Sequence, residues 1–349
     1  MSELLEKILL TEPAYRRKQI YAAWFDKKTK NYNEISTLPI GLKEKLRDIP
    51  WLTVKPTNQQ ESKAERTVKV LLELEDGNTI ESVLMGRINK KIDRKDESRN
   101  TICISTQVGC GMNCVFCATG IMGFKRNLTT QEIVDQYRFW QNYLNEEKQG
   151  EIDNVVLMGQ GEPLLNYDNV KNALNILLAH TSLGPRQITL STVGVKTGME
   201  KILIDKNFPP VRFALSLHSA IDATRKKMIP SHPSDFFTWL PNWANNFHKK
   251  FPGRSHFIGI EYTLIRGQND DNKHLKALIK LASQLGRVRI NLIPCNSANP
   301  KFDGTEKIIL ENWQKSLMAN GFTCTIRRSQ GQDIAAACGQ LANKRAKRL

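Results

Sequence analysis

Apolar residues recur with two different spacings along this chain, and the spacing changes near residue 100. Before that point, helical patterns occupy 2–10, 15–25 and 42–49. Alternating apolar positions then predict a β-hairpin of strands 67–74 and 79–85 that turns at 76–78. The polar stretch 86–100 predicts an exposed linker. We therefore expect residues 1–95 to form a small N-terminal accessory domain of helices and one hairpin.

From residue 101 onward, short apolar strands alternate with amphipathic helices. The predicted strands are 101–105, 154–158, 187–191, 211–217, 257–265 and 288–294. The helices between them are 129–144, 168–178, 197–204, 236–248 and 270–285, and a last helix, 306–320, and strand, 323–326, close an edge. Strands separated by helices form parallel sheets through right-handed crossovers. Six such units predict an open or partial barrel over 96–343, because a complete barrel needs eight.

Composition and charge narrow the class of protein and partner. The 349 residues are 40% hydrophobic and 25% charged, which is typical of a folded soluble domain and excludes collagen-like and disordered classes. We expect a cytoplasmic protein without a membrane span, since no long apolar run or signal peptide is visible. The net charge of +16 favours a polyanionic partner, most often nucleic acid, with a membrane surface as the weaker alternative. Most of this surplus follows residue 100, and part of it lies in a basic tail at 344–349.

The cysteines indicate metal or redox chemistry. Seven is an odd number, and four of the seven lie between positions 103 and 117, which fits a disulfide framework badly. Cys110, Cys114 and Cys117 form a C-x3-C-x2-C array just after the first strand of the predicted parallel sheet. Such thiolates bind zinc or an iron–sulfur cluster. No second pair of cysteines or histidines completes a structural zinc site, so the three thiolates would leave one coordination position of the metal centre open. A structural zinc knuckle is the alternative.

This cysteine array resembles that of the radical S-adenosylmethionine (SAM) superfamily. In that superfamily three cysteines hold a [4Fe–4S] cluster, whose fourth iron binds SAM. Further segments resemble, in order, those of the RlmN family of rRNA and tRNA adenine-C2 methyltransferases and of its relative Cfr, which methylates C8. The segments are CISTQVGCGMNCVFCATGIMGFKRNLTTQEIVDQ, MGQGEPLLNYDNV, ITLSTVG, FALSLHS, INLIPCN and IRRSQGQDIAAACGQL. The resemblance covers roughly 67–341 and implies an α/β fold: a partial (β/α)6 radical SAM barrel behind the accessory domain.

The resemblance also implies a reaction. Carbon 2 of adenine is electron-poor and cannot attack an ordinary methyl donor, so a radical route is needed. Cys338, in the AACGQL segment, would carry the methyl group as methyl-cysteine. Cys103 would resolve a covalent protein–RNA intermediate through a disulfide with Cys338, and Glu81 would accept the ring proton. Without this resemblance, Cys338 and Cys103 would be interpreted as core residues and Glu81 as an exposed hairpin residue.

Contacts with SAM are implied at the strand ends. Gly161 and Glu162, in the turn after strand 154–158, would meet the methionine amino group. The remaining contacts match Ser191, Ser216, Leu217, His218 and Asn296. His218 can equally be a satisfied histidine at a sheet end. Pro163 and the leucine after it resemble the C2 branch, closest to RlmN. Cys295 and Cys324 are expected to be structural.

The expected partners are 23S rRNA, tRNA as a candidate second substrate, and an electron donor such as flavodoxin; we expect a monomer. Candidates for phosphate contact are the basic groups at 125–126, 225–227 and 327–328. Two alternatives stay open: methylation of C8, and a non-enzymatic iron–sulfur or zinc RNA-binding factor.

Overall fold

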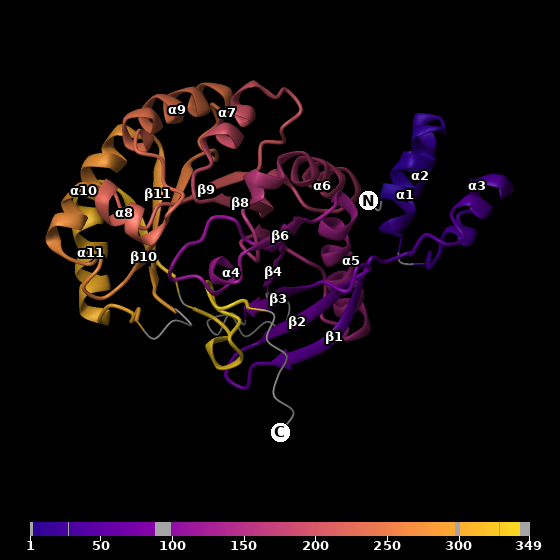
Figure 1. Cartoon of the computed structure of the whole chain (residues 1–349), viewed down its shortest axis with the longest axis horizontal. Coiled ribbons are helices and arrows are strands. Elements are labelled where there is room, and N and C mark those ends of the chain that lie inside the picture. Colours follow the sequence, from indigo (N-terminus) through magenta and orange to yellow (C-terminus); the bar gives the residue numbers. More distant parts are fainter. Residues whose placement is uncertain (1–2, 27, 88–98, 297–300, 328, 343–349) are drawn as a thin grey trace.

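The computed structural model describes residues 3–26, 28–87, 99–296, 301–327 and 329–342. Its framework is a ten-stranded sheet (Figure 1), in which β1 to β4 are antiparallel and the strands from β4 to β12 are parallel. The strand order is β1 (Val54–Glu61), β2 (Thr67–Leu74), β3 (Thr79–Arg87), β4 (Arg99–Cys103), β7 (Asn154–Leu157), β8 (Ile188–Thr192), β9 (Arg212–Ser216), β10 (Ile258–Leu264), β11 (Val288–Pro294) and β12 (Thr323–Ile326).

Six strand–helix units make up the parallel part, and each predicted strand and helix after residue 100 is found within a few residues of its expected place. The helices are α5 (Thr130–Glu146), α6 (Tyr167–His180), α7 (Lys196–Ile204), α9 (Phe236–Lys250), α10 (Asn272–Gln284) and α11 (Lys307–Ala319). The predicted α/β fold with a partial (β/α)6 barrel is therefore confirmed. In this part of the chain, the sequence did not predict the short α4 (Ala118–Ile121), α8 (Asp222–Met228), or a small sheet of β5 (Gln107–Gly109) and β6 (Phe124–Asn127).

The N-terminal hairpin belongs to the same sheet as the barrel. Strand β3 pairs with β4 in an antiparallel register that places Val83 opposite Cys103. The sequence did not predict β1, because its run VKPTNQQE is mostly polar and contains Pro56; both features are typical of an edge strand. The predicted linker falls mostly on 88–98, which lie outside the described residues, as do Arg328 and the basic tail.

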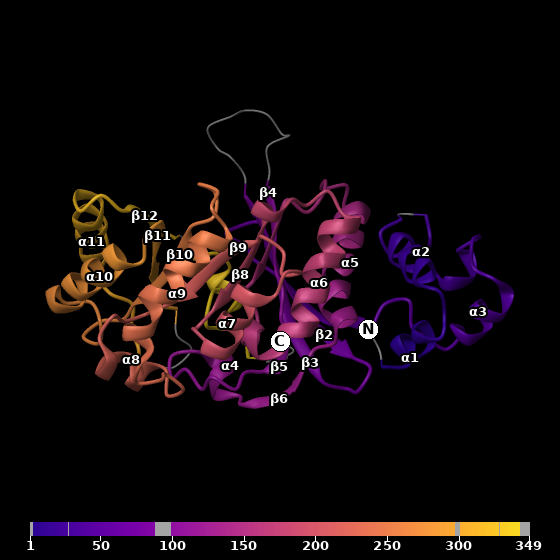
Figure 2. The same ribbon diagram turned by 90° about the horizontal axis from the view of Figure 1, so that it is seen from above.

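Three N-terminal helices lie to one side of the sheet, beyond α5 and α6 (Figure 2). They are α1 (Glu3–Leu10), α2 (Ala14–Trp24) and α3 (Ile40–Lys45). A buried ion pair on α5 joins them to the barrel: Asp135 contacts Arg138 at 2.5 Å and accepts the Thr53 N–H at 2.8 Å. Arg138 also donates to the carbonyls of Trp24 and Trp51. Among the described helices, none is long and apolar enough to cross a bilayer.

Loss of the Asp135 carboxylate should weaken this junction strongly. Asp135→Ala leaves the buried Arg138 guanidinium without its counter-ion, which typically costs about 3–5 kcal/mol of unfolding free energy. Asp168→Ala is the matched control: its carboxylate is 76% exposed and lies 3.8 Å from Lys171, so we expect a loss below about 1 kcal/mol. Urea unfolding measures both; equal effects would contradict the assignment.

Candidate active site

The three cysteines of the array lie in the loop that follows β4, at the carboxyl end of the parallel sheet. Close backbone packing holds this loop. A Cβ on Gly109, whose φ is +75°, would lie 1.9 Å from the carbonyl oxygen of Gly123, and a Cβ on Gly120 would lie 2.8 Å from that of Cys114. The Val115 N–H donates to the Met228 carbonyl at 3.0 Å, which ties the loop to the end of α8.

The three thiols interact electrostatically with one another. Burial raises the pKa of Cys110 to about 12, with smaller contributions from Glu162 and Cys117. Burial also raises the pKa of Cys114 well above its usual value, and Cys117 and Cys110 add to the shift. Burial raises the pKa of Cys117 as well. The loop therefore gathers three thiols in one buried region, close to the Glu162 carboxylate.

The chemistry of these donors fits an iron–sulfur cluster, because such clusters are held by cysteine thiolates around them. Among the described residues, no group of three cysteine, histidine or acidic side chains is arranged to hold a single metal ion.

The turn after β7 packs its backbone against the start of the cysteine loop. A Cβ on Gly161, whose φ is +99°, would lie 2.5 Å from the Gln107 Cβ. Glu162 is buried; its Oε1 accepts the Leu164 N–H at 3.0 Å and its Oε2 accepts the Val193 N–H at 2.9 Å. Burial raises the pKa of this carboxyl to about 7. Gly161 is therefore required for close approach, and Glu162 is held in place by backbone donors.

The predicted strand-end residues line the same edge of the sheet. Ser191, in β8, and Ser216, in β9, place their hydroxyl oxygens 3.1 Å apart. Leu217 is fully buried; its N–H donates to the Glu261 carbonyl at 2.9 Å and its carbonyl accepts from Arg225 at 3.0 Å. Asn296 donates to the Ser329 hydroxyl at 2.6 Å and accepts from Gln332 at 2.6 Å, which links the end of β11 to the segment after β12.

His218 is buried and its polar atoms have partners. Its Nδ1 accepts the Thr263 N–H at 3.1 Å, and its ring meets that of Phe116, from the cysteine loop, edge-on with centroids 4.9 Å apart. Burial, and after it the charge of Arg225, lowers the pKa of His218 to about 3, so the ring is neutral at physiological pH. These contacts join strand β9 to the cysteine loop.

Cys338 lies on the segment 329–342 after β12, which we call the C-terminal loop (yellow in Figure 1). Two carbonyls of this loop accept hydrogen bonds from α4. The Gly339 carbonyl accepts from the Ala118 N–H at 2.8 Å, and the Leu341 carbonyl accepts from the Thr119 hydroxyl at 2.8 Å. On the other side, Ala336 and Leu341 pack with Val83 and Cys103 of the sheet. The C-terminal loop thus lies between the sheet and the cysteine loop.

This placement brings the two predicted reactive cysteines together. Cys338 is exposed, Cys103 is buried at the end of β4, and both are free thiols. Burial and then the neighbouring Cys338 raise the pKa of Cys103 to about 12. Cys338 also contributes, after burial, to the raised pKa of Cys117. The Cys338 sulfur therefore lies within electrostatic reach of both Cys103 and the cysteine array.

Glu81 is buried rather than exposed, so the interpretation as a solvent-facing hairpin residue is wrong. Its Oε1 lies 3.1 Å from Lys69 Nζ, and its Oε2 accepts the Ala342 N–H at 2.7 Å. The C-terminal loop covers this face of the hairpin. Lys69 was not singled out from the sequence; the one signal was a lysine inside a strand whose neighbours, Val68 and Val70, are apolar.

Of the candidate phosphate contacts, Lys125, Lys226 and Lys227 are exposed, whereas three arginines have partners within the protein. Arg225 is fully buried and donates to the Leu217 carbonyl, so it is wrong as a surface contact. Arg126 pairs with Asp76 at 2.6 Å and Glu132 at 2.8 Å. Arg327 pairs with Glu261 at 3.1 Å and contacts the Met158 sulfur at 3.6 Å, which directs it into the barrel; the sequence analysis did not single out Glu261.

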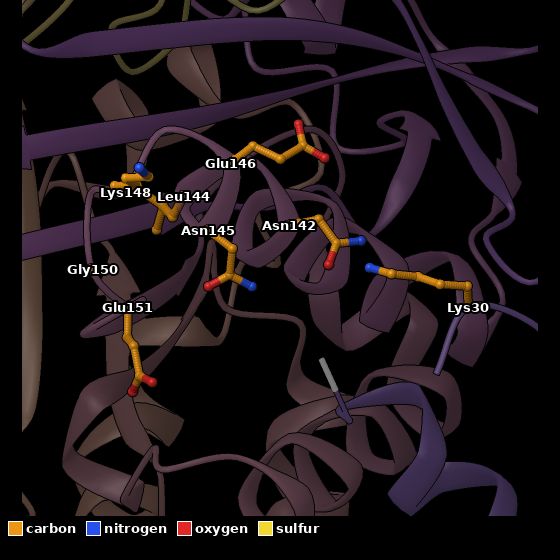
Figure 3. A pocket seen from close by; sticks show the side chains of 8 residues that line it. All are labelled: Lys30, Asn142, Leu144, Asn145, Glu146, Lys148, Gly150 and Glu151. Carbon is orange, nitrogen blue, oxygen red and sulfur yellow. The ribbon is translucent and has the colours of Figure 1, made fainter. Parts of the chain in front are cut away.

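A cavity of about 540 Å³ lies away from this edge (Figure 3). Its lining comes from the end of α5, the segment before β7, and Lys30. Because α5 ends where β7 begins, the cavity is at the amino end of the parallel strands, opposite the cysteines. Enzymes of this architecture carry their chemistry at the carboxyl ends, so the cavity is not the candidate site.

Comparison with known proteins agrees with this geometry. Residues 104–280 match the family model described as the radical SAM superfamily. The chain is 38% identical to the "Probable dual-specificity RNA methyltransferase RlmN" of Thermotoga maritima, covering 95% of this chain and 92% of that protein. It is 37% identical to the "Ribosomal RNA large subunit methyltransferase N" of Nitrosopumilus maritimus, covering 98% and 96%.

A solved structure matches over nearly the whole chain. The radical SAM methyltransferase from Sphaerobacter thermophilus superposes with a TM-score of 0.82 at 30% identity, covering 97% of each chain. Sequence identity and fold therefore agree over the barrel and the N-terminal segment alike. The chain belongs to the radical SAM superfamily and, within it, to the RlmN family.

Proposed function

We propose that this protein methylates C2 of an adenine in 23S rRNA by radical chemistry, with tRNA as a candidate second substrate. The position of Cys338 carries the proposal: an exposed thiol on a loop held between a second thiol, Cys103, and a three-cysteine array. A non-enzymatic RNA-binding factor would need the array alone. The names of the relatives, which are RNA methyltransferases, support an RNA substrate.

Cys110, Cys114 and Cys117 would hold a [4Fe–4S] cluster, and SAM would lie across the strand ends. When bound, these groups supply a methyl group and a one-electron route to a carbon-centred radical. Glu162 and the turn at Gly161 would face the methionine amino group. The hydroxyls of Ser191 and Ser216, together with Leu217, His218 and Asn296, would complete the binding surface. An electron donor such as flavodoxin would reduce the cluster.

The chain's own residues then perform the transfer. Cys338 carries the methyl carbon on its sulfur and presents it to the base. Glu81 accepts the ring proton once the base is attached to that carbon, and the unpaired electron left by the radical addition would leave by the one-electron route that the cluster supplies. Cys103 then loses its thiol proton and attacks the Cys338 sulfur: a disulfide forms, the sulfur–carbon bond breaks with its electron pair on carbon, and that carbon takes a proton. The contribution of Cys338 to the raised pKa of Cys103 supports the nearness of the two sulfurs.

Cluster binding should depend on the array and not on the other thiols. We expect Cys114→Ala to lose the iron after anaerobic reconstitution, because one of the three thiolates that hold the cluster is missing. Cys324→Ala is the matched control, since Cys324 is also buried but lies in β12. Iron quantification and visible absorbance measure both. Stoichiometric zinc without iron in the unmodified protein would contradict the cluster.

The product tests the proposal directly. The reconstituted protein, with SAM, a reductant and an unmodified 23S rRNA fragment, should yield 2-methyladenosine after digestion to nucleosides. Chromatography against both methyladenosine standards, followed by mass spectrometry, identifies it. 8-Methyladenosine would assign the chain to C8 chemistry, and no methylated adenosine with a loaded cluster would reject the function.

Removal of the Cys103 thiol should stop the reaction after the carbon–carbon bond forms. Cys103→Ala then leaves Cys338 joined to the RNA, because no thiol displaces it. A denaturing gel should show a slower, nuclease-sensitive protein band, which Cys338→Ala lacks. If Cys103 is only a core residue, Cys103→Ala should lose about 1 kcal/mol of stability and turn over normally, without the shifted band.

A further inference from the structure

A buried lysine lies beside Glu81. Lys69, in β2, has a side chain that is only 7% exposed, and its Nζ lies 3.1 Å from Glu81 Oε1. The strand register pairs Lys69 with Val83, and Val83 with Cys103 on the next strand. Glu81 is two residues from Val83 and therefore on the same face. Lys69, Glu81 and Cys103 thus share the face that the C-terminal loop covers.

Lys69 and Glu81 also hold the two ends of the segment that carries Cys338. Lys69 Nζ donates to the carbonyl of Ala335 at 3.2 Å, and the N–H of Ala342 donates to Glu81 Oε2 at 2.7 Å. Ala335 has a φ of +51°, a left-handed conformation that residues with a Cβ rarely adopt. The ammonium therefore fixes an unfavourable backbone conformation three residues before the reactive thiol.

The charge of Lys69 matters for the chemistry of Glu81. Glu81 is buried, and a buried charge is costly unless an opposite charge lies beside it. Lys69 supplies that charge 3.1 Å from Glu81 Oε1. Only the carboxylate form of a glutamate can act as a base. Stability alone does not explain the pair, since a buried ion pair is often no more stable than apolar residues of the same size.

We propose that Lys69 is a positioning residue that serves as the counter-ion of the Glu81 carboxylate and holds it directed at the base attached to Cys338. The inference rests on the proposed function, in which Glu81 accepts the ring proton. In that step the carbon–hydrogen bond at C2 breaks, the proton goes to a Glu81 oxygen, and the electron pair stays with the ring. In this account Lys69 acts through Glu81 and not on the RNA or the cofactor itself.

The test follows release of the covalent protein–RNA adduct in Lys69→Met, Lys69→Arg and Glu81→Gln, using the reconstituted full chain, SAM, a reductant and a 23S rRNA fragment. Intact-protein mass spectrometry first measures methylation of Cys338, and denaturing gels then measure the adduct over time. We expect Lys69→Met to methylate Cys338 normally but to release the adduct at least about tenfold more slowly, as for a lost general base. Lys69→Arg should recover most of the rate because it keeps the cation.

A matched control separates this effect from the loss of an ion pair in general. Lys171→Met breaks the half-buried pair with Asp205, 2.9 Å apart, on the outer helix α6, and should release the adduct at the normal rate. If Lys69→Met releases the adduct at the normal rate and Glu81→Gln accumulates it, the role of Lys69 is overturned and that of Glu81 stands. Normal turnover in Glu81→Gln would overturn Glu81 as the acceptor, and the inference with it.

A double variant keeps the inference testable if Lys69→Met folds poorly. Lys69→Met with Glu81→Gln leaves no buried unpaired charge, so its folding should resemble that of the unmodified protein. Because Lys69 acts through Glu81, the double variant should release adduct at the same rate as Glu81→Gln alone. A further slowing of about tenfold or more would show that Lys69 acts independently of Glu81, which overturns the inference.

Discussion

The position of one exposed thiol depends on hydrogen bonds that reach the C-terminal loop from both sides. Cys338 itself lies outside the described helices and strands, so none of them fixes its place directly. Donors from α4 hold the carbonyls of Gly339 and Leu341, and the Glu81–Lys69 pair holds the loop at Ala335 and Ala342. Without these contacts Cys103 would keep its place at the end of β4, but the Cys338 thiol would have no defined position beside it.

The barrel could be predicted from the sequence because its signals are local. Each parallel strand is a short apolar run, and each crossover helix has its own amphipathic pattern, as in the capping box of Thr129 and Glu132 that begins α5. The edge strand β1 escaped prediction because an edge is polar, and β5 and β6 escaped because they are very short. The predicted hairpin was correct in place, but its pairing with β4 was not predicted, because residues 86–100 between the two apolar strands carry no pattern that indicates it.

The residues of the candidate site could likewise be predicted only in part from the sequence. The cysteine array and the turn at Gly161 are contiguous motifs, and the resemblance identified them together with Cys338 and Cys103. The burial of Glu81 and the presence of Lys69 beside it could not be predicted, because the covering segment lies more than 260 positions along the chain. Arg225, in α8, was misassigned for a similar reason: its partners Val193 and Leu217 directly follow strands β8 and β9, and only the folded sheet brings them to it.

The most direct test of whether the C-terminal loop presents a reactive thiol is to identify the cysteine that receives the methyl group from SAM. The reconstituted protein is incubated with SAM carrying a deuterated methyl group, without RNA, then digested and mapped by tandem mass spectrometry. The label should appear on the peptide that contains Cys338, as a thioether, and be absent from peptides containing Cys103, Cys295 or Cys324. Label on another cysteine, or no labelled peptide in a protein with a full cluster, would contradict the role of Cys338.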